Sequence, residues 1–112
     1  MSSSASPAPG PIRIRARQRA GEGVTELVFL MPHPMETGLR KNPAGGFVPA
    51  HFISELRVSV QGRTVFEARL TAAVSRDPLL SLRFRGAQAG DRVTVDWLDT
   101  QGNRRSDSGL IV

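Results

Sequence analysis

The sequence predicts an all-β protein, a single antiparallel β-sandwich of about seven strands. Apolar and polar residues alternate over short runs, such as Ile12-Arg13-Ile14-Arg15-Ala16-Arg17, and a period of two is typical of half-buried strands. Turn-forming residues separate these runs at regular intervals. No stretch of useful length has the periodicity of a helix.

The first two predicted strands span residues 12–17 and 24–31. In the first strand, arginines occupy one face and apolar side chains occupy the other. The second strand is apolar on both faces near its end, so we expect its second face to meet a loop or another protein. Pro32 and Pro34 end this strand, because proline lacks the backbone donor that a β-ladder requires.

The next two predicted strands, residues 52–60 and 64–70, are joined by a tight turn at Gln61-Gly62, a weaker form of the Asn-Gly hairpin signal. Both strands alternate, so one face of each turns toward the core. The residues expected on these inward faces are Phe52, Leu56, Val58 and Val60, followed by Phe66, Ala68 and Leu70.

Three further strands complete the predicted sandwich, at residues 79–85, at residues 92–99 and within residues 104–112. Glycine-containing turns separate them, and Gly109 suggests a bulge in the last strand. The residues expected on their inward faces are Leu80, Leu82 and Phe84, followed by Val93, Val95 and Trp97.

The stretch from residue 30 to residue 56 holds the connection between the second and third predicted strands. It contains both histidines, the only lysine and four of the eight prolines. Long loops in compact domains are usually functional or disordered, and the apolar residues Met35, Leu39 and Phe47 argue against disorder. We therefore predict a folded flap at the end or edge of the β-domain that serves as a contact surface.

Length and composition narrow the class of protein. The 112 residues suit one domain, which we expect to span residues 12–112 after a disordered Ser- and Pro-rich tail at residues 1–11. Because cysteine is absent, the chain has no disulfide, thiol nucleophile or thiolate metal ligand. No apolar run is long enough to span a membrane, and the first residues lack the basic start and apolar core of a secretory signal.

The net charge is +5 and comes almost entirely from arginine. A basic surface attracts anions or acidic partners and makes nucleic acid a candidate ligand. Nucleic-acid platforms also use exposed aromatic side chains for stacking, whereas tyrosine is absent here and the phenylalanines mostly face inward. We therefore expect the arginines to face solvent or a protein partner, and we expect no nucleic-acid binding.

The two histidines raise the alternative of a metal site. Imidazole and thioether ligands suit copper, so His33, His51 and Met35 could form a small site of this kind. Neither a cysteine nor a nearby carboxylate completes a recognisable ligand set. No serine or threonine lies in a nucleophile motif, so we expect neither a resident cofactor nor catalysis by this chain.

Two motifs in the long connection resemble a known family. His33-Pro34-Met35-Glu36-Thr37-Gly38-Leu39-Arg40-Lys41 and Pro49-Ala50-His51-Phe52-Ile53 are similar to SoxZ, a subunit of the sulfur-oxidation (Sox) carrier complex. The similarity extends to Val93-Thr94-Val95-Asp96-Trp97 and covers nearly the whole chain after residue 11. It implies an immunoglobulin-like β-sandwich. The cysteine–tryptophan–cysteine pattern of antibody domains is missing, so the likeness to those domains is one of topology.

The resemblance also implies a function. SoxZ pairs with SoxY, which carries a cysteine on a flexible, glycine-flanked C-terminal arm. Sulfur derived from thiosulfate is attached to that cysteine, and other Sox enzymes oxidise, hydrolyse and release it. The complex works in the bacterial periplasm, and SoxY bears the twin-arginine export signal. The resemblance thus implies a non-catalytic subunit of the SoxYZ heterodimer that is exported with SoxY and transiently contacts other Sox enzymes.

Residue type and position select candidate interface residues in the long connection. Apolar and aromatic side chains concentrate in interface cores, while charges at the rim affect association rate and specificity. The expected apolar anchors are Met35, Leu39, Phe47 and Phe52, and the expected rim residues are Glu36, Arg40 and Lys41. The predicted partner interface also includes Met31, His33 and His51.

Overall fold

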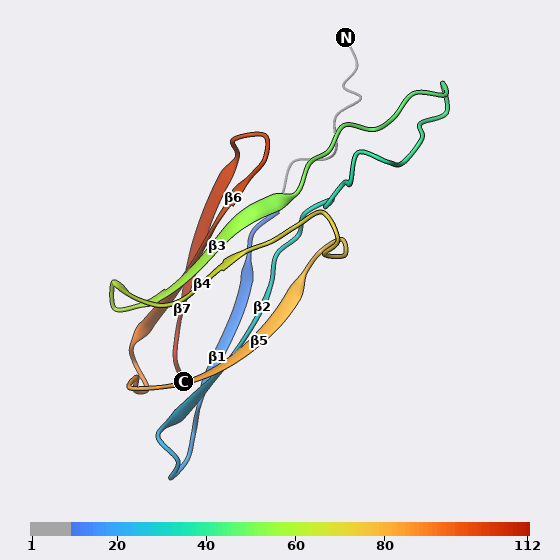
Figure 1. Cartoon of the computed structure of the whole chain (residues 1–112). Helices are drawn as coiled ribbons and strands as arrows, with labels where there is room; N and C mark the ends of the chain where they lie inside the picture. The colour runs from blue at the N-terminus through green and yellow to red at the C-terminus, as the bar shows by residue number, and fades with distance from the viewer. Residues whose placement is uncertain (1–9) are drawn as a thin grey trace.

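Seven strands form two antiparallel sheets packed face to face in the computed structural model, which describes residues 10–112 (Figure 1). The strand order is β1-β2-β5 in one sheet and β4-β3-β6-β7 in the other. The predicted all-β sandwich is therefore confirmed. The described residues contain no helix that is long and apolar enough to cross a membrane. The strands are β1 (Arg13–Arg19), β2 (Val24–Leu30), β3 (Ile53–Val60), β4 (Arg63–Arg69), β5 (Leu79–Arg85), β6 (Arg92–Asp99) and β7 (Arg104–Leu110).

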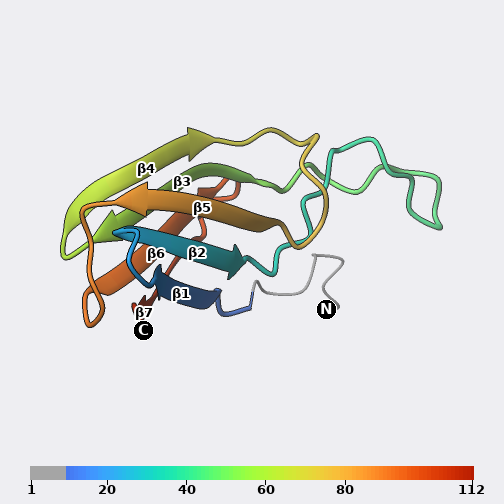
Figure 2. The same ribbon diagram turned by 90° about the horizontal axis from the view of Figure 1, so that it is seen from below.

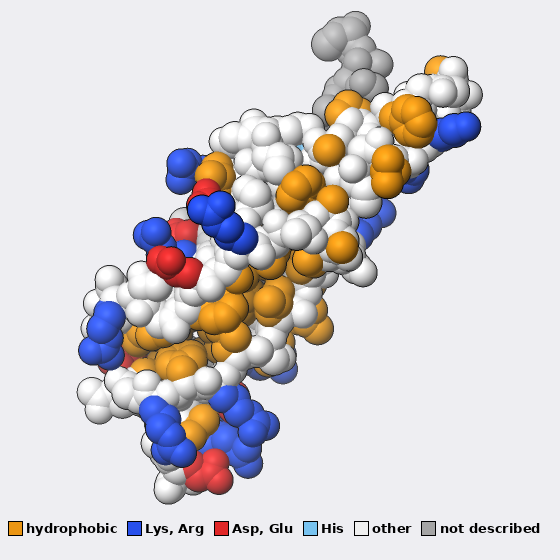
Figure 3. Space-filling model, in the orientation of Figure 1, with side chains coloured by type: hydrophobic (Ala, Val, Ile, Leu, Met, Phe, Trp, Pro, Cys, Tyr) orange, Lys and Arg blue, Asp and Glu red, His pale blue; other side chains and the backbone are white. Residues whose placement is uncertain are grey.

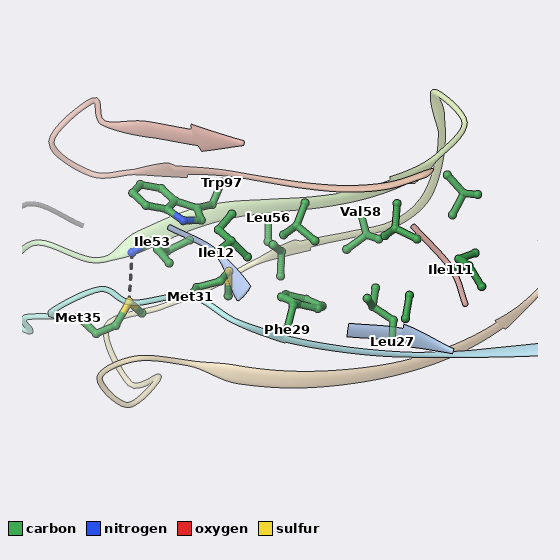
Figure 4. Packing of buried hydrophobic residues seen from close by; sticks show 14 residues of the cluster. Ile12, Leu27, Phe29, Met31, Met35, Ile53, Leu56, Val58, Trp97 and Ile111 are labelled. Carbon is green, nitrogen blue, oxygen red and sulfur yellow. Dashed lines mark hydrogen bonds between the residues drawn. The ribbon is translucent and has the colours of Figure 1, made fainter. Parts of the chain in front are cut away.

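Hydrophobic side chains from both sheets fill the space between them (Figure 4). Their placement follows the alternation in the sequence: Ala16 of β1 is buried, while its neighbours Arg15 and Arg17 are exposed. Burial of apolar surface contributes roughly 25 cal/mol per Å², so fully covered residues dominate the stability of the sandwich. The hydrophobic residues at 0% exposure are Leu27, Phe29, Met31, Ile53, Val58, Val93 and Val95.

The start of β3 differs from the prediction. The strand begins at Ile53, and its pairing with β6 shifts register between Ile53 and Glu55. This irregularity turns Ile53 inward, whereas Phe52 precedes the strand and is only half-buried. The prediction that the strand begins at Phe52 is therefore wrong, although Phe52 does pack against the core. The predicted bulge at Gly109 is also wrong, because Gly109 pairs with Val93 in continuous register.

The two long sides of the sandwich are closed to different degrees. On one side, Ala16 of β1 forms a parallel bridge with Ile111, and Val112 N donates to Ala16 O at 3.1 Å. On the other side, β4 and β5 are both edge strands. In constant-type immunoglobulin domains the fourth strand joins the sheet of the first, second and fifth, whereas here it pairs with β3. The side between β4 and β5 is therefore left open.

Residues 31–52 project beyond the end of the sandwich as a long hairpin (Figures 1 and 2). The molecule is accordingly elongated, with principal extents of 57 × 25 × 18 Å. This is the folded flap at the end of the β-domain that the sequence predicts. The predicted disordered tail falls mainly on residues 1–9, which lie outside the described residues.

Candidate functional site

The projecting hairpin (residues 31–52) is a two-stranded ribbon held by its own backbone. Near its base, Glu36 and His51 exchange hydrogen bonds of 2.7 and 2.9 Å. Farther out, Val48 N donates to Arg40 O at 2.8 Å. An isolated two-stranded hairpin is at best marginally stable in water, so the base of this one needs support from the sandwich.

The tip of the hairpin is shaped by Asn42. Its Oδ1 accepts the backbone N–H groups of Ala44 and Gly46, each at 3.0 Å, and its own N–H donates to Gly46 O at 2.8 Å. Gly45 adopts a left-handed backbone with φ of 89°, which glycine reaches without steric cost. The turn therefore follows from the local sequence Asn-Pro-Ala-Gly-Gly.

His33 lies at the base of the hairpin and is held on three sides. Its backbone N–H donates to Asp77 Oδ1 at 2.9 Å. Its Nδ1 accepts the N–H of Met35 at 3.1 Å, so the ring proton sits on Nε2. That nitrogen lies 3.0 Å from Asp99 Oδ2 and donates to it. The ring also meets Trp97 edge to face, with the centroids 5.2 Å apart.

Asp99 is the last residue of β6 and binds both histidines. His51 Nε2 lies 2.6 Å from Asp99 Oδ2, and Asn103 Nδ2 donates to the same oxygen at 3.0 Å. Asp99 Oδ1 accepts the backbone N–H groups of Gln101 and Asn103 at 3.0 and 2.9 Å. The carboxylate thus receives five hydrogen bonds, and its side chain is 0% exposed. We call His33, His51 and Asp99 the His–Asp cluster.

Burial and hydrogen bonding set the charges in the His–Asp cluster. Burial by itself would raise the pKa of Asp99, but hydrogen bonds from His33, Asn103 and His51 lower that pKa to about 2. Burial lowers the pKa of His33 below its ordinary value of 6.5, because the hydrogen bond to Asp99 only partly offsets the loss of hydration. At neutral pH, Asp99 is therefore ionised and His33 is uncharged.

The His–Asp cluster has the composition of a metal site, and its three ligand atoms lie within 4.8 Å of one another. Two imidazoles and a carboxylate are ordinary zinc ligands. Here, however, the ionised carboxylate accepts from both Nε2 atoms, so a metal ion would have to displace both ring protons. The sulfur of Met35, the predicted thioether ligand, accepts the N–H of Ile53 at 3.3 Å (Figure 4). The arrangement fits a hydrogen-bonded anchor for the hairpin better than a metal centre.

The outer part of the hairpin presents apolar and charged side chains to solvent (Figure 3). Leu39 is 78% exposed and Phe47 is 57% exposed. Arg40 donates two hydrogen bonds, of 3.1 and 2.6 Å, to the carboxylate of Glu36, and these lower the pKa of Glu36 below its ordinary value. Large apolar side chains exposed together on a projecting hairpin are typical of a contact surface.

Comparison with known proteins identifies the family. A family model described as "Sulphur oxidation protein SoxZ" matches residues 12–109, nearly the whole chain. The chain belongs to the SoxZ family. None of the curated proteins compared with this SoxZ-family chain matches it.

Two solved structures share the fold of this SoxZ-family chain. A hypothetical protein from Pyrococcus horikoshii OT3 superposes with a TM-score of 0.62 at 11% sequence identity, covering 93% of this chain and 89% of the other. The superoxide reductase (neelaredoxin) of Archaeoglobus fulgidus, in its reduced form, has a TM-score of 0.58 at 19% identity, covering 91% and 86% of the two chains. At such low identities the likeness concerns the fold alone.

The predicted interface residues of the SoxZ-family chain divide by burial. The exposed ones are Leu39, Arg40, Lys41 and Phe47, and the half-buried ones are Glu36 and Phe52. The buried ones are Met31, His33, Met35 and His51, none more than 5% exposed. In the free chain, the side chains of these four are covered by the chain itself. Contact between any of the ten residues and a partner stays a prediction.

Sequence reasoning missed the polar partners of the histidines, above all Asp99. The metal interpretation found no nearby carboxylate, but the fold brings Asp99 to His51 and His33 across 48 and 66 residues. One signal was available, because Asp99 continues the inward-facing alternation of Val95 and Trp97 along the sixth strand.

Proposed function

We propose that this chain is a non-catalytic subunit of the SoxYZ carrier and binds SoxY, the subunit that holds the sulfur intermediate on its cysteine. Membership of the SoxZ family is the observation that carries the proposal. The absence of cysteine supports it, because this chain cannot carry sulfur on a thiolate. Within residues 10–112, the one cluster of histidine and carboxylate ligands is buried, so it does not reach a substrate in solvent.

The projecting hairpin is the surface that we assign to SoxY. Its exposed Leu39 and Phe47 supply apolar anchors, and Arg40 and Lys41 supply charge around them. The His–Asp cluster beneath holds the hairpin in one position. A rigid projection loses less conformational entropy on binding than a flexible loop does.

Co-expression with the protein encoded beside it tests the partnership. The chain is purified through an affinity tag, and the mass of any co-purifying protein is measured. We expect an equimolar small protein with a C-terminal Gly-Gly-Cys-Gly-Gly arm. Recovery of the chain alone, folded and monodisperse, would contradict the proposal.

Replacing both Leu39 and Phe47 by serine tests the hairpin. We expect the Kd for SoxY, measured by titration calorimetry, to rise about tenfold or more, because buried anchors carry most interface energy. Leu110→Ser is the control, since it changes a leucine that is 52% exposed on β7, away from the hairpin. Equal affinities of the hairpin variant and the unaltered chain for SoxY would show that the hairpin is not part of the interface.

The proposal includes a location. The chain works in the bacterial periplasm and is exported as a folded passenger of SoxY. Fractionation of cells expressing the chain with SoxY, or with SoxY lacking its export signal, tests this. We expect the chain in the periplasm only in the first case. A periplasmic chain in both cases would contradict passenger export.

A small metal-binding β-sandwich is the alternative function, favoured by the convergence of His33, His51 and Asp99. It requires about one metal ion per folded chain. We expect elemental analysis of the purified protein to find no stoichiometric metal, because hydrogen bonds already engage these ligand atoms. Stoichiometric zinc or copper that His51→Ala removes would support the alternative.

A further inference from the structure

β5 is an edge strand with neither a bulge nor a proline. Proteins usually shield a strand edge with charge, proline, a bulge or a covering segment. The edges of β1 and β7 approach each other through the bridge between Ala16 and Ile111, and the pairing of β4 shifts register at Val58 and Ser59 of β3. By contrast, β5 pairs with β2 in unshifted register and contains no proline, so its two exposed arginines, Arg83 and Arg85, are its main protection.

The inward side of β5 is apolar and incompletely covered. Leu82 and Leu80 pack against the core but stay half-buried, although Leu27 and Phe29, their pairing partners on β2, are 0% exposed. Phe84 is half-buried as well. Figure 3 shows hydrophobic side chains gathered in a strip along the open side between β4 and β5. One further strand beside β5 would be needed to cover this part of the core.

The outward side of the same sheet is also apolar near this edge. Val28 is 37% exposed and Leu79 is 65% exposed. With Leu30 and the arginines Arg13 and Arg15 they line a shallow depression of about 270 Å³. The sequence predicts that this face of the second strand meets a loop or another protein, and no loop of the described chain covers it.

The charges around the β5 edge are positive on balance, with Arg19, Arg83 and Arg85 set against the carboxylates of Glu22 and Glu26. Arg83 and Arg85 are exposed, and the one carboxylate that pairs with Arg83, Glu26 at 3.1 Å, also lies 3.6 Å from Arg19. An acidic segment complements such an edge. A second copy of this chain does not, because pairing two β5 edges would bring more arginines to an arginine-rich surface.

We propose that an extended segment of the partner subunit, in which apolar and acidic residues alternate, adds to β5 as a fourth strand of the β1-β2-β5 sheet. Backbone hydrogen bonds along the free edge supply affinity, as in other cases of strand addition. The apolar residues of the segment cover Leu80, Leu82 and Phe84, while its acidic residues face outward beside Arg83 and Arg85. The inference rests on the proposed function for the identity of the partner, and it adds a second contact to that of the hairpin.

Amide hydrogen exchange tests the strand addition in the purified SoxY complex. We expect amides in residues 79–85 to exchange about tenfold or more slowly than in the free chain, because new backbone hydrogen bonds protect them. Residues 100–103, in the turn between β6 and β7, should keep their exchange rates. Failure of any partner to co-purify would contradict the proposed function. A stable complex with unchanged exchange in residues 79–85 would overturn this inference alone.

Charge reversal supplies an independent test. Arg83→Glu with Arg85→Glu changes the β5 edge, and the control, Arg92→Glu with Arg104→Glu, makes the same change of net charge at exposed positions of β6 and β7 in the other sheet. We expect the β5 variant to raise the Kd about tenfold more than the control variant does, since only the former opposes the acidic segment. Equal effects of the two variants would overturn the assignment to β5. If the free chain sedimented as a dimer and the β5 variant as a monomer, the β5 edge would instead pair with a second copy of this chain.

Discussion

A single carboxylate, that of Asp99, ties the base of the hairpin to the end of β6. We expect Asp99→Ala to lower the free energy of unfolding by about 3 kcal/mol, because the buried N–H donors of His33 and His51 lose their acceptor. Urea denaturation measures the change. The control is Asp96→Ala, a half-buried carboxylate on the outward side of the same strand, where we expect a change within about 0.5 kcal/mol. Equal losses in the two variants would show that the His–Asp cluster does not anchor the fold.

The lowered pKa values of His33 and Asp99 predict a fold that weakens stepwise in acid. At both groups the unfolded chain binds protons more readily than the folded chain, so stability falls as the pH falls. The loss at His33 begins below its ordinary pKa of 6.5, and the loss at Asp99 follows between pH 3.8 and about 2. Urea midpoints recorded from about pH 8 to about pH 3 check this.

His33→Gln separates the two steps. Glutamine does not titrate, so the variant should be less stable throughout but should lose little further stability between about pH 7 and pH 5, where the unaltered chain weakens. Parallel pH profiles for the two proteins would assign the first step to another group.

At the scale of residues, the sequence predicts which side chains share the hairpin but not what they bind. His33 and His51 could be assigned to one segment because prolines and turn residues bound it. Asp99 and Asp77 reach His33 through the pairing of distant strands and through a separate loop. Local pattern carries no information on such contacts until the strand order is known.

At the scale of elements, the alternation of apolar and polar residues predicts where the strands lie, but it predicts their first and last residues less well. Periodicity reports which face is apolar, and it places all seven strands within a few residues of the structure. A bulge depends on the pairing with the neighbouring strand, so the register shift between Ile53 and Glu55 was not readable from β3 alone.

Two alanine substitutions at the start of β3 test this register. Ile53→Ala should lower the free energy of unfolding by about 3 kcal/mol, because it leaves a cavity beneath a side chain that is 0% exposed. Phe52→Ala should cost about 1 kcal/mol, since Phe52 is half-buried and precedes the strand. Urea denaturation of both variants gives the order of the two losses. If Phe52→Ala lowered the free energy of unfolding more than Ile53→Ala does, Phe52 would be the inward-facing residue at the start of the strand, as the sequence predicts.

At the scale of the whole molecule, the decisive feature is the position of β4. The sequence predicts two packed sheets, but it does not say which sheet the fourth strand joins, because its inward face is apolar in either case. By pairing with β3, β4 leaves β5 as an edge and one long side of the sandwich open. The interaction surface that we propose there follows from strand order, which no local motif encodes.

The difference in burial between Leu27 and Leu82 shows how far the side between β4 and β5 is open to solvent. They are pairing partners on adjacent strands and face the same core, but Leu27 is 0% exposed and Leu82 is half-buried. In the free chain, Leu27→Ala should lower the free energy of unfolding by about 3 kcal/mol and Leu82→Ala by about 1 kcal/mol, because the second removes less buried surface. Urea denaturation of the free chain gives both values, and titration with SoxY should then show that Leu82→Ala also weakens binding. Equal losses in the free chain would mean that β4 and β5 already close together in solution, and the argument for a missing strand would fail.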